Sequence, residues 1–345
     1  MRNSKEKIVL SYQEQIDHFK SRGVIFGPEF DEKRAKEYLK SHNVFFRLKA
    51  YCFDFEDLES DTCGRLNFSD LVDLARIDDR LRKLIMYLAI DIEHFSKVQL
   101  LGLITKKCTG RDAYEIVGDY ESWSVYNQRI KGRSLKKIND IVGPNSHGTY
   151  VKELYEKYRI GNNGKNEYRF PVQALLDIMS FGTYVNFYEF CVTELIDNLS
   201  EKWTEILYLL RKIKDARNGA VHDNCFINDL KVKNADYEPD RHMVEILAQE
   251  GVPKPIRKRS LQNEKVLQMI TCLYSYRELV VSSSKNYYKF LDRPYTHVPL
   301  DLQIEMKFFS DQLEIFIKNP PNNLKSIVEQ TLKLIKKLVD SWYLS

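Results

Sequence analysis

The chain has 345 residues, of which 43% are hydrophobic and 30% are charged, and its formal net charge is +4. This length allows one large domain or two ordinary ones, and the composition is that of a soluble globular protein. The small positive charge is compatible with a nucleic-acid partner without requiring one.

Cysteine spacing and apolar runs argue against several classes of protein. The six cysteines stand singly, with no Cys-x2-Cys pair, which disfavours a disulfide scaffold or a zinc ribbon and fits a reducing cytosol. The N-terminus lacks the apolar core of a signal peptide, and no run of about 18 apolar residues is present for a membrane span. We therefore expect a cytoplasmic, soluble protein.

The first hundred residues predict helices joined by one irregular link. Residues 11–14, Ser-Tyr-Gln-Glu, form a capping box that opens a short helix closing at Gly23. A second helix is expected over 30–42, and the aromatic run 44–55 is expected to be irregular or extended. From 69 to 107 the apolar spacing continues without a proline, which predicts one very long helix or two nearly collinear ones.

The middle of the chain predicts loops and shorter helices. Glycine-containing polar pieces at 143–149 and 161–166 are typical of loops. A helix is expected over 171–181, with a proline at its start, and Gly182 is expected to break it before a further helix over 184–199. Because no strand-like alternation of apolar and polar residues persists, the sequence predicts an all-α fold.

A charged segment with three prolines, 231–259, is the best candidate boundary in the chain. Amphipathic patterns after it predict three helices, near 260–291, 299–317 and 321–343. The predicted organisation is a helical domain, a linker and a C-terminal helical region, at residues 1–230, 231–259 and 260–345.

The stretch 200–224, SEKWTEILYLLRKIKDARNGAVHDN, predicts a helix in which a charged residue interrupts the apolar face. The apolar residues recur at steps of three and four, and they are Trp203, Ile206, Leu207, Leu210, Ile213, Ala220 and Val221. At about 100° per residue, Arg217 falls near the middle of that face. Arginine cannot lose its charge on burial, so its side chain must face a paired carboxylate or a wet cleft.

Two more polar residues accompany this arginine. Asn218 and His222 are four residues apart, so they lie one above the other at the edge of the apolar face. Gly219 between them weakens a helix by roughly 1 kcal/mol relative to alanine. The cluster therefore lowers the local stability of the helix.

The motif Arg217-Asn218-x3-His222 resembles the Arg-x4-His signature of HEPN-domain ribonucleases. Three further segments resemble parts of the bacterial abortive-infection (Abi) family, and they occur in the family's order: Asn43–Tyr51 (NVFFRLKAY), Asp79–Arg82 with Ile92-Glu93, and Pro171–Thr183 (PVQALLDIMSFGT). The resemblance covers roughly residues 11–228. It implies a HEPN-like helical bundle with additional N- and C-terminal helices.

Two positions depart from the family's pattern. Lys97 stands where the family has an arginine, and a lysine keeps the charge but lacks the bidentate fork that clamps a phosphate. Asp223-Asn224-Cys225 stands where a His-rich tail often follows the motif.

The motif suits RNA cleavage without a metal ion. A base must remove the 2′-OH proton, an acid must protonate the leaving 5′ oxygen, and a cation must stabilise the charge on phosphorus. Histidine suits the first two tasks and arginine the third. One His222 cannot serve both ends of the displacement, but two copies can if a two-fold axis joins two motif helices. The resemblance likewise implies a composite site in a homodimer.

The other candidate residues have supporting roles. Asn218 would orient the imidazole or bind substrate, and Glu93 and Lys97 would support the site. Structural alternatives remain for Arg217, Glu93 and His222: Arg217 could pair with Glu93 or with Asp91. His222 could be a helix-end histidine that interacts with the last carbonyl groups.

The resemblance therefore implies a metal-independent endoribonuclease toxin in antiphage defence, acting as a homodimer, with an antitoxin of protein or RNA as a candidate partner. The chain contains no His-Glu-x2-His, no Walker loop and no Gly-x-Gly-x2-Gly, so no metal or cofactor is expected. The alternative is a non-catalytic module that binds RNA or a protein partner through the same cleft.

Overall fold

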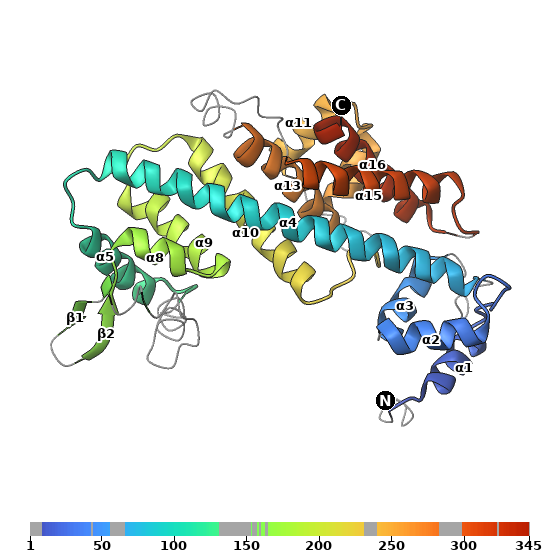
Figure 1. The fold of residues 1–345 in the computed structure, drawn as a ribbon. Helices are drawn as coiled ribbons and strands as arrows, with labels where there is room; N and C mark the ends of the chain where they lie inside the picture. Colours follow the sequence, from blue (N-terminus) through green and yellow to red (C-terminus); the bar gives the residue numbers. More distant parts are fainter. Residues whose placement is uncertain are drawn as a thin grey trace. The chain divides into compact units, whose positions relative to one another are not determined.

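The computed structural model describes residues 9–42, 44–55, 66–130, 153, 157–158, 160–162, 165–230, 240–282, 299–322 and 324–344. The chain divides into two compact units, and helices dominate both (Figure 1). The first unit comprises Met1–Leu88, Ala216–Arg277 and Val281–Ser345, and the second comprises Ala89–Asp215 and Glu278–Val280. The predicted all-α class is confirmed.

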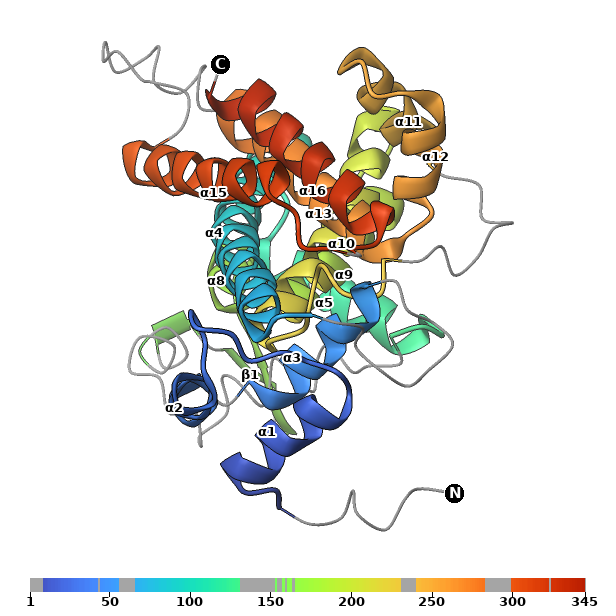
Figure 2. The ribbon, with the colours of Figure 1, turned by 90° about the vertical axis from the view of Figure 1, so that its right-hand side faces the viewer.

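Short N-terminal helices begin the first unit, and they gather at the start of a long helix (Figure 2). The elements are α1 (Tyr12–Ser21), α2 (Glu32–His42), α3 (Phe45–Tyr51), the 3-10 turn η2 (Cys52–Asp54) and the first part of α4 (Phe68–Lys107). The predicted capping box is present, because Ser11 accepts the Glu14 N–H at 3.3 Å and the Glu14 carboxylate accepts the Ser11 N–H at 2.7 Å. The long helix predicted from 69 to 107 is also confirmed as one helix.

Phe68 is the centre of this N-terminal core. Its ring is buried, and its centroid lies 5.6 Å from that of Phe19, 5.2 Å from that of Phe26 and 5.5 Å from that of Phe30. Such edge-to-face and offset arrangements add stabilisation beyond the buried area alone. The aromatic cluster therefore fixes the N-terminal segments to the beginning of α4.

The C-terminal part of the first unit is a further group of helices, tied to the N-terminal part where the Lys325 N–H donates to the Asp54 carbonyl at 2.9 Å. Its elements are α11 (Arg241–Gln249), α12 (Lys254–Leu261), α13 (Glu264–Ser275), η4 (Tyr276–Val281, shared with the second unit), α15 (Leu300–Lys318), α16 (Ser326–Val339) and η6 (Asp340–Leu344). Helix α16 packs against α13 and α15 (Figure 2). Its buried residues include Leu332, Ile335 and Leu338. Of the predicted linker, residues 231–239 lie outside the described residues, and the remainder carries α11 and most of α12.

The second unit holds the rest of α4 and most of the motif helix. Its further elements are α5 (Ala113–Tyr126), β1 (Ile160–Asn162), β2 (Lys165–Arg169), α8 (Val172–Ile178), α9 (Phe181–Phe190), the π-helical turn η3 (Cys191–Leu195) and α10 (Glu201–Val221, continuing into the first unit). Helix α5 packs against α8 and α9, and the buried Tyr120 ring meets Phe187 edge-on at 5.1 Å.

Three local predictions are wrong. The run 44–55 is not extended but forms α3 and η2, because Phe45, Leu48 and Tyr51 recur at helical spacing and are buried. Of the piece 161–166, residues 161–162 lie in β1 and residues 165–166 lie in β2, and these strands pair antiparallel with Ile160 opposite Arg169. They are the named strands of the described residues.

The third error concerns the break near Gly182. The helices separate at Met179 and Ser180 instead, where Ser180 accepts the Thr183 N–H as the N-cap of α9, so Gly182 lies inside the first turn. The predicted loop at 143–149 lies outside the described residues.

The predictions about disulfides and about membrane spans can be compared with the described residues. Cys108, Cys191, Cys225 and Cys272 carry free thiols, whereas Cys52 is disulfide-bonded, which the scattered cysteines did not predict. None of the described helices has the length and apolar character needed to cross a membrane.

Candidate functional site

The motif residues lie at the C-terminal end of α10. The His222 N–H donates to the Asn218 carbonyl at 3.0 Å, and the Asn224 N–H reaches back to the Gly219 carbonyl at 3.0 Å. The intervening Asp223 has a left-handed φ of 57°. This is the geometry of a Schellman-type helix end, in which the residue after the cap turns left-handed so that the last carbonyl groups find donors.

Arg217 and Asn218 are in contact beside this helix end. Arg217 is half-buried, and its Nη1 donates to Asn218 Oδ1 at 3.3 Å. Ala216 and Ala220 on either side of Arg217 are buried, as the predicted apolar face requires. The guanidinium therefore lies at the edge of the apolar face, where it donates a hydrogen bond to Asn218.

Asn218 and His222 are exposed, so their polar groups are open to a ligand. Val221 was expected on the apolar face, but it is 47% exposed, because the face turns away from the core over the last turn of α10. The structure thus places Arg217 and Asn218 in the last turns of α10 and His222 directly after its last residue, all in the first unit.

The two supporting residues lie in the second unit and contact each other there. Lys97 Nζ is 2.9 Å from Glu93 Oε1, donates to the Met179 carbonyl at 3.1 Å and lies 5.5 Å from the centroid of the Tyr184 ring. These contacts fix the side chain of Lys97 between α4 and the end of α8. They give Glu93 and Lys97 a structural part within the second unit.

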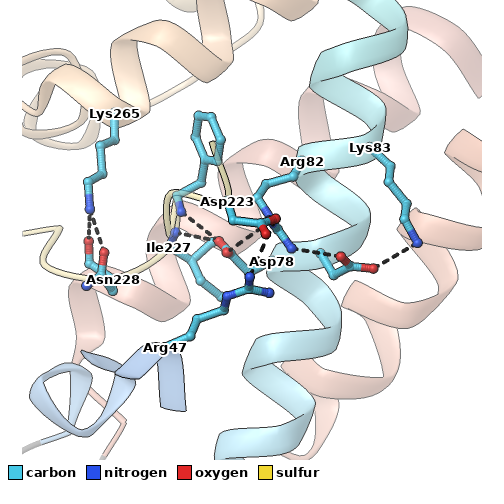
Figure 3. A network of polar contacts seen from close by, with 10 residues as sticks. Arg47, Asp78, Arg82, Lys83, Asp223, Ile227, Asn228 and Lys265 are labelled. Atoms are coloured by element: carbon cyan, nitrogen blue, oxygen red, sulfur yellow. Dashed lines mark hydrogen bonds and ion pairs between the residues drawn. The ribbon is translucent and has the colours of Figure 1, made fainter. Parts of the chain in front are cut away.

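The carboxylate of Asp223 is held by two arginines from other elements (Figure 3). Arg82 of α4 donates to it, and Arg47 of α3 lies 3.5 Å from it. Arg82 is only 5% exposed and also donates to Asp79 at 2.7 Å, with Asp78 3.9 Å away. A guanidinium this buried needs its carboxylate partners, because an uncompensated buried charge is strongly destabilising.

Asp78 anchors the loop that follows the motif by accepting hydrogen bonds from its backbone. Its Oδ1 accepts the N–H groups of Phe226 and Ile227 at 2.8 and 3.0 Å (Figure 3). Burial raises the pKa of the Asp78 carboxyl, against the opposing effects of these donors, of Tyr51 and of Arg82. One buried carboxylate on α4 thus satisfies two backbone donors of a segment about 150 residues later in the chain.

The end of the same loop has its own anchors. The Asp229 N–H, from a second residue with left-handed φ (53°), donates to Asp54 Oδ1 at 3.0 Å. Lys265 of α13 donates to the Asn228 carbonyl at 2.7 Å and also to its side-chain oxygen (Figure 3). Burial raises the pKa of Asp54 to about 7, although Lys325 and Lys265 favour its charged form. Residues 223–230 are therefore fixed at both ends.

Sequence reasoning gave no role to Arg47, Asp78, Arg82 or Asp223. Arg47 and Arg82 lie inside segments quoted for the family resemblance, and Asp223 was noted only as a departure from a His-rich tail. The contacts join these segments in space, since Asp223 after the motif meets Arg47 of the first segment and Arg82 of the second. The signal available in the sequence was an arginine in each of the two earlier segments and an aspartate directly after the motif.

Among the described residues, no group of three or more His, Cys, Asp or Glu side chains is arranged to hold a metal ion.

Comparison with known proteins gives one family. The family model described as Abi-like protein matches residues 37–228, which is more than half of the chain and includes Arg47, Asp78, Arg82 and the whole motif. No curated protein and no solved structure matches the chain. The network around Asp223 lies entirely within the matched residues. The chain belongs to the Abi-like protein family.

Proposed function

We propose that this protein is a metal-independent endoribonuclease of the HEPN type that acts in abortive-infection defence against phage. Membership of the Abi-like family suggests the abortive-infection role. The observation that carries the enzymatic proposal is the grouping of half-buried Arg217 with exposed Asn218 and His222 at the end of α10. A guanidinium and an open imidazole at the same helix end are groups that transesterification of RNA can use.

The roles follow from the chemistry of each side chain. His222 removes the 2′-OH proton or protonates the 5′ oxygen, because imidazole exchanges protons near neutral pH. Arg217 stabilises the charge that develops on the phosphoryl oxygens. Asn218 accepts a hydrogen bond from Arg217, which supports a part in directing the guanidinium as well as in binding substrate.

A single chain supplies one His222, so the reaction needs a second copy at the other end of the displacement. We propose a homodimer in which a two-fold axis pairs the two motifs. Cleavage per milligram of protein should then fall steeply when the enzyme is diluted below its dimer dissociation constant. Constant specific activity for a species shown to be monomeric by analytical ultracentrifugation would contradict the composite site.

Growth of the producing cells tests the proposal as a toxin. Overproduction of the wild-type protein should slow growth, and Arg217→Ala or His222→Ala should relieve the effect. His94→Ala is the matched control, because His94 is an exposed histidine on α4 with no role in the proposal, and this variant should remain toxic. Equal toxicity of the Arg217→Ala/His222→Ala double variant would refute the catalytic assignment. A neutralising antitoxin, protein or RNA, is the expected partner.

A non-catalytic module that binds RNA or a protein partner is the second candidate. The pairing of Lys97 with Glu93 and with the Met179 carbonyl favours it, because a lysine occupied in this way is not a ready phosphate clamp. Tight RNA binding without cleavage by the purified protein would establish this alternative.

A further inference from the structure

Asp223 has a backbone conformation that few side chains adopt. Its φ of 57° lies in the left-handed region, where glycine is favoured and aspartate is tolerated at some cost. A glycine would end α10 without this cost. The chain instead carries an aspartate whose carboxylate reaches two arginines, which indicates that the side chain has a use beyond ending the helix.

The arginines that receive Asp223 are themselves held in place. Arg82 is buried and is fixed on its own helix by Asp79 at 2.7 Å, while Asp78 lies 3.9 Å from its Nε. Arg47 approaches from α3 with only 17% of its side chain exposed (Figure 3). The carboxylate of Asp223 therefore meets preorganised guanidinium groups, and the two ion pairs tie the end of α10 to α3 and α4.

We propose that Asp223 is a positioning residue that fixes His222 for catalysis by pairing with Arg82 and Arg47. His222 lies between two restraints, since its own N–H donates to the Asn218 carbonyl and the next residue, Asp223, is anchored by Arg82 and Arg47. The exposed imidazole consequently projects from a backbone that is fixed on both sides. The inference rests on the proposed function, because His222 matters only if it takes part in the reaction.

Three variants separate positioning from mere stability. Asp223→Gly keeps the left-handed turn and removes both ion pairs. Asp223→Asn also tolerates this turn and keeps an oxygen that can accept from Arg82. Asp79→Asn is the matched control, because it weakens a partner of Arg82 without touching the end of α10.

Rates of RNA cleavage and unfolding midpoints are measured for all three variants. Asp223→Gly should lower kcat by between about 10- and 100-fold with little change in KM, because a small displacement of a catalytic group has an effect of this size. Asp79→Asn should stay within about threefold of wild type, and Asp223→Asn should fall between the two. The midpoints of Asp223→Gly and Asp79→Asn should be similar.

Three outcomes would overturn the inference: wild-type kcat in Asp223→Gly, parallel loss in Asp79→Asn, or an Asp223→Asn variant no better than Asp223→Gly. The NMR signal of the His222 Cε1 proton gives a readout that does not need activity. It should be sharp in wild type and Asp79→Asn but broadened or split in Asp223→Gly. If wild type fails to cleave RNA, the proposed function is wrong. In that case an unchanged signal in Asp223→Gly overturns the positioning role, and a broadened one supports it.

Discussion

Residues 217–222 and residues 223–230 follow one another in the chain, yet they differ in how their polar groups are bonded. In the motif turn, Asn218 and His222 are exposed, and Arg217 contacts its neighbour Asn218. In the loop, backbone donors at 226, 227 and 229 are received by the buried carboxylates of Asp78 and Asp54. The contrast teaches that the anchored loop directly follows the motif, and that the side chains of Asn218 and His222 are left open to solvent.

The largest effect should come from removing the loop's main acceptor. Asp78→Ala leaves two buried N–H groups and Arg82 with fewer partners, so we expect a loss of about 3–5 kcal/mol in the free energy of unfolding, measured with urea. The control is Asp73→Ala, which removes an exposed pair with Arg76 on the same helix and should change stability by no more than about 0.5 kcal/mol.

Equal effects of Asp78→Ala and Asp73→Ala would contradict the contrast, because the loop would then not depend on its buried acceptor. A smaller loss in the free energy of unfolding for Asp78→Asn than for Asp78→Ala would show that the loop depends on the acceptor oxygen itself. The amide oxygen can still accept the N–H groups of Phe226 and Ile227.

The second effect is a dependence of stability on pH through Asp54. Its folded pKa of about 7 lies above the unfolded value of about 3.9, so between these values the native state holds a proton that the unfolded chain has released. This carboxyl should therefore lower stability progressively as pH rises from about 4 to about 7, by on the order of a few kcal/mol, with no further change above that window.

Asp54→Asn tests this account because its amide oxygen can still accept the Asp229 N–H while the titration is removed. Urea unfolding curves are measured at about every pH unit between about pH 4 and about pH 8. The free energy of unfolding should depend less on pH in the variant than in wild type. An unchanged slope would show that Asp54 is ionised in the folded protein throughout this range.

The smallest effect concerns the motif turn itself. A Cβ at Gly219 would meet Phe226 Cζ at 3.5 Å, an ordinary contact, so Gly219→Ala should raise stability by about 0.5–1 kcal/mol through higher helix propensity. Gly110→Ala is the opposite control, because Gly110 has a φ of 84° and its replacement should destabilise the protein. A destabilised Gly219→Ala variant would indicate that the turn needs close backbone approach.

The regular elements could be predicted from the sequence wherever one periodicity dominated. The helix from Phe68 to Lys107 has an unbroken apolar period and no proline, and it is observed as predicted. Helix α3 was missed because most residues in its stretch are aromatic or apolar, on its exposed as well as its buried side, which hides the helical period. Phe46 illustrates this, since it is 80% exposed among buried neighbours.

The grouping of the motif residues was predictable, because positions four apart on a helix must lie together. The network around Asp223 was not, because its partners come from segments more than a hundred residues away. No local pattern pairs Asp78 with the N–H groups of Phe226 and Ile227. Only the order of the family segments indicated that these parts of the chain belong to one structure.

The most direct test of the central claim is cleavage of a labelled RNA panel by the purified protein in EDTA, with identification of the product ends. The account predicts 2′,3′-cyclic phosphate ends from wild type, loss of cleavage in His222→Ala, and wild-type cleavage in the His94→Ala control. Equal cleavage by wild type and His222→Ala, or binding of RNA without cleavage, would contradict it.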